Sequence, residues 1–220
     1  MGDLRDFAKN WAPEKKPGIK ERIKKVFKKE PPLRLRVVQA VHMLKVQTHR
    51  LEYMIARLKE RDQELFERVV EAQMEGDKLR AQVYAGEVAE IRKVVKTLMM
   101  AKLALERVIL RLETITSLSD AVVALVPVVG VVKELKSKLM GIVPEIALEI
   151  AEVGEMLESL VVETGEYTGI TMGVGSVTPE AKKILQEAAV IAEQRLREEF
   201  PALPELPATS SSEGAKAENS

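Results

Sequence analysis

The 220-residue sequence predicts an all-α protein built on a long antiparallel helical hairpin, followed by shorter amphipathic helices. Charged residues make up 31% of the chain and aromatic residues only 4%, which is typical of long helices and not of β-sheet proteins. Apolar residues also recur with alternating spacings of four and three through two long stretches. Only one short Gly-Asp break separates these stretches, so the two helices are expected to fold back on each other.

Residues 1–30 are predicted to form an amphipathic and basic membrane-contact segment. Leu4, Phe7 and Trp11 share one face at helical spacing. The stretch from Ile19 to Lys29 adds six basic residues, which are Lys20, Arg22, Lys24, Lys25, Lys28 and Lys29. Interfacial helices combine apolar insertion with attraction to anionic head groups, and each Lys or Arg near the surface adds about 1 kcal/mol. These nine residues are therefore the candidate membrane-binding residues.

Two alternatives apply to the same segment. Phe7 and Trp11 can pack onto the protein's own core, and the basic residues can neutralise nucleic-acid phosphates. Nucleic acid is disfavoured because there are few aromatic side chains to stack on bases and no known binding module is visible. We therefore expect anionic lipid as the partner, and no nucleic acid.

The sequence contains neither a secretory signal nor a stretch long enough to cross a bilayer. The longest apolar run, from Ala121 to Val132, has twelve residues, whereas a spanning helix needs about 20. We expect a cytoplasmic protein whose contact with membranes is peripheral.

Residues 31–141 are predicted to hold the hairpin and a short third helix. The first helix is expected from Leu33 to Glu75, about 65 Å at 1.5 Å per residue, with the turn near Glu75–Lys78. Its apolar stripe is Val37, Val41, Leu44, Thr48, Leu51, Ile55, Leu58, Asp62, Leu65, Val69 and Ala72, with Thr48 and Asp62 as exceptions. The second stripe is Tyr84, Glu87, Ile91, Val94, Leu98, Ala101, Leu105, Val108, Leu112 and Ile115. Beyond it, Ser119-Asp120 is expected to cap a short helix that ends by Pro127 and Gly130, and residues 131–140 are expected to be helical again.

Residues 142–200 are predicted to form acidic regulatory helices joined by a glycine-rich linker. The first helix has an apolar stripe of Ile146, Ile150, Val153, Leu157 and Leu160. Five glycines between Gly154 and Gly175, beyond this helix or near its end, are expected to mark the linker. Thr178-Pro179 is a strong start for a last helix that runs to about Glu199, because Thr is a good cap and Pro suits the first helical position.

The two halves of the chain carry opposite charge. Residues 1–111 hold 26 Lys/Arg and 16 Asp/Glu, a net charge of +10, whereas residues 112–220 hold 8 and 18, a net charge of −10. A basic half suits a polyanionic surface, and an acidic half can fold back onto it. The alternative is that the charges fell on the helix faces by chance.

No catalytic constellation is visible, so we expect a protein that is not an enzyme and holds no metal or cofactor. The absence of cysteine excludes disulfides, thiolate metal sites and cysteine nucleophiles. His42 and His49 share one helical face but have no carboxylate at ligand spacing between them. The glycines of residues 169–176 follow no strand and precede no Gly-Lys-Ser/Thr, so they predict a linker and not a phosphate loop.

Residues 201–220 are predicted to be a proline-rich peptide followed by a disordered tail. In this peptide Leu203 and Leu206 alternate with Pro204 and Pro207. Proline holds such a segment extended, so it can dock in a partner's groove at little entropic cost. The alternative is a simple stop signal after a helix.

These features together resemble the ESCRT-III family. The run Gly76–Arg92 resembles the family's turn and early second helix, and Leu105–Thr114 resembles its later part. Leu203–Pro207 resembles the proline-type motif by which these subunits bind the MIT domains of their disassembling AAA ATPase. The lack of cysteine and the Val-, Glu-, Arg- and Lys-rich helices favour the archaeal cell-division (Cdv-type) branch, because they fit a thermophile's composition.

The resemblance implies a non-enzymatic subunit that polymerises on anionic membranes, with itself and with paralogous ESCRT-III subunits. Such filaments would drive constriction or scission in cell division or vesicle budding, and the subunit would be recruited peripherally to the division site. It further implies that Leu203, Pro204, Leu206 and Pro207 bind the MIT domain. The alternatives are a helical-bundle adaptor that does not polymerise, and a phage-shock-type membrane-maintenance protein, although the latter would not be expected to carry the proline motif.

Overall fold

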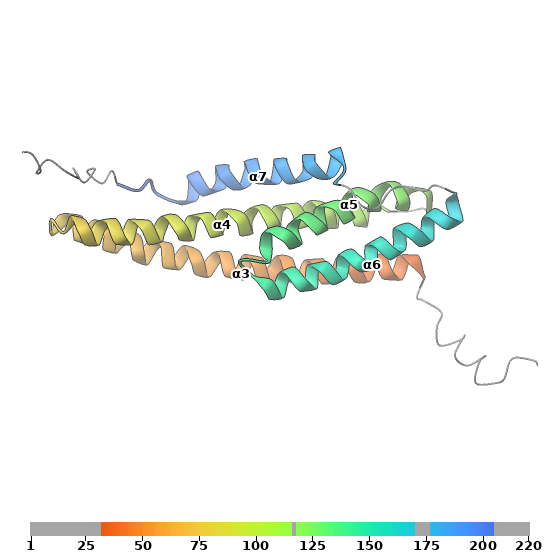
Figure 1. Ribbon diagram of the computed structural model, residues 1–220, viewed down its shortest axis with the longest axis horizontal. Coiled ribbons are helices and arrows are strands. Elements are labelled where there is room, and N and C mark those ends of the chain that lie inside the picture. Colours follow the sequence, from red (N-terminus) through yellow and green to blue (C-terminus); the bar gives the residue numbers. More distant parts are fainter. Residues whose placement is uncertain (1–31, 116–117, 170–176, 205–220) are drawn as a thin grey trace, which may run out of the picture. The chain divides into compact units, whose positions relative to one another are not determined.

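The computed structural model describes residues 32–115, 118–169 and 177–204 of the chain, and every regular element in these ranges is an α-helix (Figure 1). The helices are α3 (Leu33–Met74), α4 (Lys78–Glu113), α5 (Leu118–Leu139), α6 (Pro144–Thr168) and α7 (Pro179–Glu199). The predicted all-α class is thereby confirmed. The candidate membrane-binding residues of the first 30 positions lie outside the described residues.

The two longest helices, α3 and α4, form the predicted antiparallel hairpin. Gly76 adopts a left-handed conformation (φ 75°) in the turn, and the Asp77 side chain caps α4 by accepting a hydrogen bond from the Arg80 amide at 3.0 Å. Residue numbers rise along one helix and fall along the other in the ion pairs that join them, which are Lys45–Glu113 (2.7 Å), Glu52–Lys102 (2.8 Å) and Asp62–Arg92 (2.7 Å).

The apolar seam of the hairpin follows the predicted stripe on α3, where all eleven positions are buried except the half-buried Leu58. On α4 the predicted stripe is correct from Leu98 onward but wrong near the turn, where Glu87 is exposed. The seam there consists of Ala81, Ala85 and Val88. The larger side chains of Tyr84 and Ile91 are partly buried and pack beside this seam.

Helix α5 differs from its prediction because it runs unbroken through Pro127. The expected start after Ser119-Asp120 is also wrong, since the helix begins at Leu118. A proline inside a helix removes one backbone hydrogen bond and strains the preceding turn. The side chains around it, from Leu125 to Val132, are buried, and this burial offsets the cost of the proline.

Helix α6 confirms the predicted stripe, since Ile146, Ile150, Val153, Leu157 and Leu160 are all buried. The helix runs beyond this stripe to Thr168 and ends at a left-handed Gly169, so Gly154 and Gly165 lie inside it and not in a linker. Gly154 serves packing: a Cβ atom there would lie 3.0 Å from a methyl carbon of Val132 on α5. The glycine therefore lets α5 and α6 pack closely.

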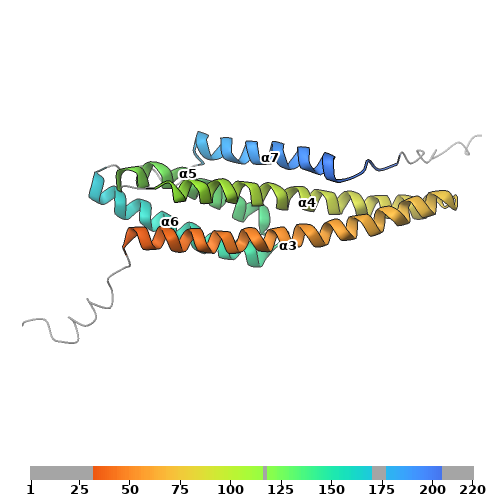
Figure 2. The same cartoon turned by 180° about the vertical axis from the view of Figure 1, so that it is seen from behind.

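Helix α7 starts as predicted, with Thr178 accepting a hydrogen bond from the Ala181 amide at 3.1 Å and Pro179 in the first turn. It lies along α4, and the view from behind shows the same arrangement (Figure 2). Its N-terminal end also contacts α5, where a Cβ on Gly130 would lie 3.2 Å from the Ala181 Cβ. The acidic C-terminal part of the chain is thus placed on the hairpin.

Candidate functional site

A series of ion pairs lies between α7 and the hairpin. Four carboxylates spaced along α7 each pair with a basic side chain of the hairpin: Glu180 with Arg111 (2.6 Å), Glu187 with Arg107, Glu193 with Lys96, and Glu199 with Lys59. Three of these basic residues belong to α4 and one to α3. Specific ion pairs therefore join the acidic C-terminal half of the chain to its basic N-terminal half.

The Lys96 ammonium, through its hydrogen bond and its charge, holds the pKa of the Glu193 carboxyl below its usual value. Arg197 adds to this lowering from the next turn of α7. The pKa of Glu52 on α3 is lowered in the same way by Lys102 of α4. All of these groups keep contact with water, so the solvent screens each pair and its contribution to stability is small.

The apolar face of α7 is small. Its buried residues are Ala181, Ile184, Ala188 and Ala192, whereas α6 buries a stripe of Ile, Val and Leu side chains. Because the free energy of burial scales with apolar area, α7 is held on the hairpin less strongly than α6 is held in its place.

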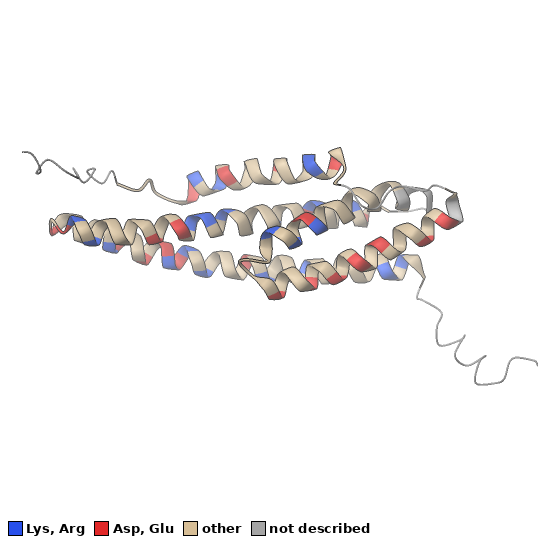
Figure 3. Cartoon of the chain, viewed as in Figure 1, with Lys and Arg blue, Asp and Glu red and all other residues tan. Residues whose placement is uncertain are grey.

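Helix α6 is the most one-sided element in charge. It carries Glu residues at seven positions and neither Lys nor Arg (Figure 3). Glu149 contacts α3 by accepting hydrogen bonds from Arg50 at 2.7 Å and from Gln47. Lys133 of α5 pairs with Glu158 at 2.9 Å. Acidic groups of both α6 and α7 therefore meet basic groups of the hairpin.

Near the tip of the hairpin, Arg92 of α4 joins three parts of the chain. It binds Asp62 of α3 with two hydrogen bonds, of 2.7 and 3.0 Å, and donates a third to the Pro201 carbonyl at 2.7 Å. Its guanidinium also lies over the rings of Phe66 and Phe200, 5.8 and 5.3 Å from their centroids. The Asp62 side chain is only 3% exposed and that of Arg92 13%, so this ion pair is largely withdrawn from water.

The five residues after α7, Phe200–Pro204, form what we call the strap. Phe200 is buried, and Leu203 packs against a cluster of Leu65, Val69, Ala85 and Val88 inside the hairpin. Pro204 is half-buried. Leu206 and Pro207, the other two residues of the predicted motif, lie outside the described residues.

The strap is the feature that sequence reasoning missed. In the sequence Asp62 is only a polar exception in an apolar stripe, and no pattern indicates Arg92 as its partner. A buried acid at a seam position requires a nearby cation, so Asp62 was the one available signal. The Pro-rich motif itself gives no sign that its first leucine packs on the same chain.

The described residues hold no cluster of ligands for a metal ion. His42 and His49 are both exposed, and His49 lies 3.7 Å from Glu52. In the same part of the chain, no helix is long and apolar enough to span a membrane.

The chain is similar to two cell division proteins from Sulfolobus acidocaldarius. The chain is 46% identical to Cell division protein B1 over 200 residues, which cover 91% of this chain and 90% of that protein. It is 41% identical to Cell division protein B over 164 residues, which cover 74% of this chain and 63% of that protein. No protein-family model matches the chain. No solved structure matches it either.

Proposed function

Because the chain belongs to the family of the archaeal cell division proteins B and B1, the archaeal Cdv-type branch of ESCRT-III, we propose that it is a subunit of a membrane-remodelling polymer in cell division. The observation that carries the proposal is the 46% identity, which extends over nine-tenths of both chains. The polymer would form on anionic membranes from this chain and paralogous subunits, and it would drive constriction or scission.

The contacts between α7 and the hairpin support a switch between a closed and an open form. Four ion pairs at the surface and a small buried face of three alanines and Ile184 hold α7 weakly. Release of α7 would free Lys59, Lys96, Arg107 and Arg111 for lipid or for the next subunit. A switch of this kind keeps the subunit from assembling until it reaches the membrane.

Membrane contact is assigned to the first 30 residues. Leu4, Phe7 and Trp11 would insert at the interface, and the six basic residues from Lys20 to Lys29 would bind head groups. Binding to anionic lipid is therefore expected to weaken as salt rises, since exposed charges are screened.

The proline motif is assigned to the MIT domain of a disassembling AAA ATPase, with Leu203, Pro204, Leu206 and Pro207 as the contact residues. Leu203 packs on the hairpin cluster, so it cannot fill a partner's groove at the same time. Binding of the ATPase would therefore require the strap to leave the hairpin. The strap and α7 are adjacent in sequence, so release of one favours release of the other.

Co-sedimentation with vesicles of phosphatidylcholine and phosphatidylglycerol tests the membrane assignment. Replacing Phe7 and Trp11 with Glu should abolish pelleting, while the helical circular dichroism of the hairpin is retained. The matched control replaces the exposed Tyr53 of α3 with Glu and should pellet like wild type. If the F7E/W11E variant pellets like wild type, the apolar part of the assignment is wrong.

A further inference from the structure

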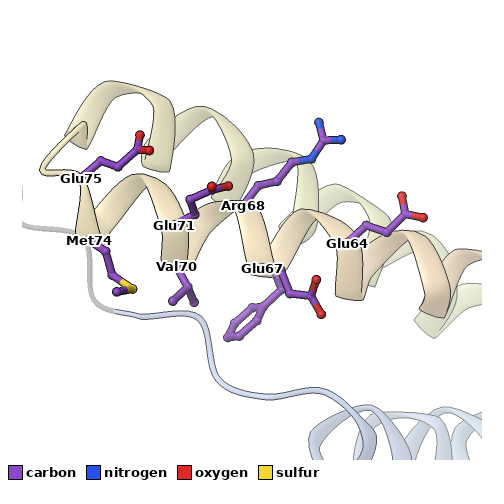
Figure 4. A pocket seen from close by; sticks show the side chains of 8 residues that line it. Glu64, Glu67, Arg68, Val70, Glu71, Met74 and Glu75 are labelled. Atoms are coloured by element: carbon purple, nitrogen blue, oxygen red, sulfur yellow. The ribbon is translucent and has the colours of Figure 1, made fainter.

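The face of α3 that carries Phe66, Val70 and Met74 near the hairpin tip lines an open groove of about 820 Å³. The strap runs beside the Phe66 end of this groove, where Arg92 contacts the rings of both Phe66 and Phe200. Its floor is an apolar row of Phe66, Val70 and Met74, which follow one another at intervals of four residues and so share a face. Met74 is 84% exposed and Val70 38%. Figure 4 shows Val70 and Met74 pointing to the same side of the helix. A row of apolar side chains of this kind can pack against the apolar face of a second helix.

An acidic row runs beside the apolar row. Glu67, Glu71 and Glu75 each follow directly after a member of the apolar row, about 100° further around the helix. Glu64 and Arg68 also line the groove (Figure 4), and the Arg68 guanidinium lies 5.9 Å from the centroid of the Tyr84 ring. The four carboxylates outnumber this one cation, so the lining is acidic on balance. Glu64 pairs with Arg61 and Glu75 with Arg80, whereas neither Glu67 nor Glu71 forms an ion pair with any residue that the structure describes. The groove is therefore complementary to a helix that has an apolar face flanked by basic side chains.

One segment of this chain has that pattern. Within Ile19–Lys29, the apolar residues Ile19, Ile23, Val26 and Phe27 share one face at helical spacing. A basic row flanks this face on each side: Lys20, Lys24 and Lys28 on one, Arg22, Lys25 and Lys29 on the other. In paired helices, charged rows that flank an apolar face meet across the interface. We infer that residues 19–29 dock in the groove, with one basic row against Glu67 and Glu71.

The docked segment must come from a second copy, because the chain that connects it to α3 is too short to reach the groove of its own subunit. Helix α3 rises 1.5 Å per residue, so Val70 lies about 55 Å from Leu33 at the start of the helix. The seven residues from Val26 to Leu33 span at most about 25 Å when fully extended. The segment therefore cannot reach the groove of its own chain. Each docking event links the N-terminal region of one subunit to the hairpin tip of another.

The C-terminal tail, residues 205–220, also lies outside the described residues and is a second candidate occupant of the groove. Its charges oppose this, because residues 205–220 contain three Glu and one Lys, and they would face an acidic row. Docking of residues 19–29 rests on the proposed polymer and adds a specific contact to it. Only one of the two basic rows is needed for the groove, so the other row stays available for lipid head groups.

Disulfide cross-linking tests this contact in full-length protein, because the chain has no cysteine of its own. Val26→Cys and Val70→Cys are made in separate chains, one of which carries a size tag. The two are mixed on phosphatidylcholine–phosphatidylglycerol vesicles and mildly oxidised. The heterodimer is expected to form about tenfold faster than with Val190→Cys, an exposed valine on α7, because docking raises the local concentration of the thiols. Adding E67K and E71K to the Val70→Cys chain should return the rate to that of the control.

Three outcomes would overturn the inference. These are equal rates for the Val70→Cys and Val190→Cys chains, no effect of E67K and E71K, or faster linkage of Val70→Cys to a Leu206→Cys chain, which would identify the tail as the occupant. The pelleted fraction separates this contact from the wider proposal. If the wild-type protein pellets with vesicles but the Val26→Cys and Val70→Cys chains give no linkage, only the docking is contradicted. Wild-type protein that does not pellet contradicts the membrane polymer itself.

Discussion

The ion pair between Asp62 and Arg92 should dominate the stability of the hairpin tip, and Asp62→Ala tests this. The variant leaves the Arg92 guanidinium, which is 13% exposed, without its anion. Removing one partner of a buried ion pair lowers the free energy of unfolding by about 3–5 kcal/mol. Because Arg92 is partly exposed, we expect a loss of about 3 kcal/mol, at the lower end of this range. For a chain of this size, that loss lowers the Tm by about 6–12 °C.

Glu64→Ala provides the matched control on the same helix. Glu64 pairs with Arg61 at 2.9 Å, but both side chains are at least half exposed, so its loss should cost about 0–1 kcal/mol. Thermal unfolding followed by helical circular dichroism measures both variants. The D62A/R92A double variant should cost little more than D62A alone, because it removes the uncompensated charge. If D62A is no less stable than E64A, the withdrawn ion pair does not hold the hairpin tip together.

Three further predictions follow from separate contacts. The pKa of Glu193 is lowered below its ordinary value of 4.5, so its pairing with Lys96 stabilises the fold above that value and is lost as the pH falls through the lowered pKa. The Tm difference between wild type and E193Q should therefore be present near neutral pH and vanish in acid well below 4.5; an unchanged difference in acid would contradict it. Gly154→Val should lower the free energy of unfolding by about 1–3 kcal/mol through its contact with Val132, whereas Gly86→Ala, in open space, should raise it by up to about 1 kcal/mol, both measured by denaturant titration. Changing Leu203 and Leu206 to Asp should weaken binding to the MIT domain by more than about tenfold, measured by calorimetry. The reason is that burial of each leucine side chain contributes about 1.5–3 kcal/mol of binding free energy. Arg92→Ala, which releases the strap, should instead strengthen binding to the MIT domain.

Local signals allowed the hairpin to be predicted from the sequence. The stripe from Val37 to Ala72, the turn at Gly76-Asp77 and the start of α7 at Thr178-Pro179 each depend on residues close together in the chain. The charge split likewise indicated that an acidic part would lie on a basic part. It could not identify which partners meet, since Glu187 and Arg107 are far apart in sequence and any exposed pair is weak.

Features that depend on tertiary packing could not be predicted from the sequence. Pro127 and Gly154 are ordinary signals for breaks, yet burial against neighbouring helices keeps both inside helices. The seam near the hairpin tip uses Ala81 and Ala85, which a search for large apolar residues passes over. The contact of Arg92 with Pro201 joins positions 109 apart, and no pattern in the sequence specifies it.

Negative-stain electron microscopy of the full-length protein, with and without phosphatidylcholine–phosphatidylglycerol vesicles, tests the central claim most directly. A membrane-remodelling polymer predicts filaments or tubulated vesicles when anionic lipid is present. Monodisperse particles under both conditions would contradict the claim and identify the chain as a helical adaptor that does not polymerise.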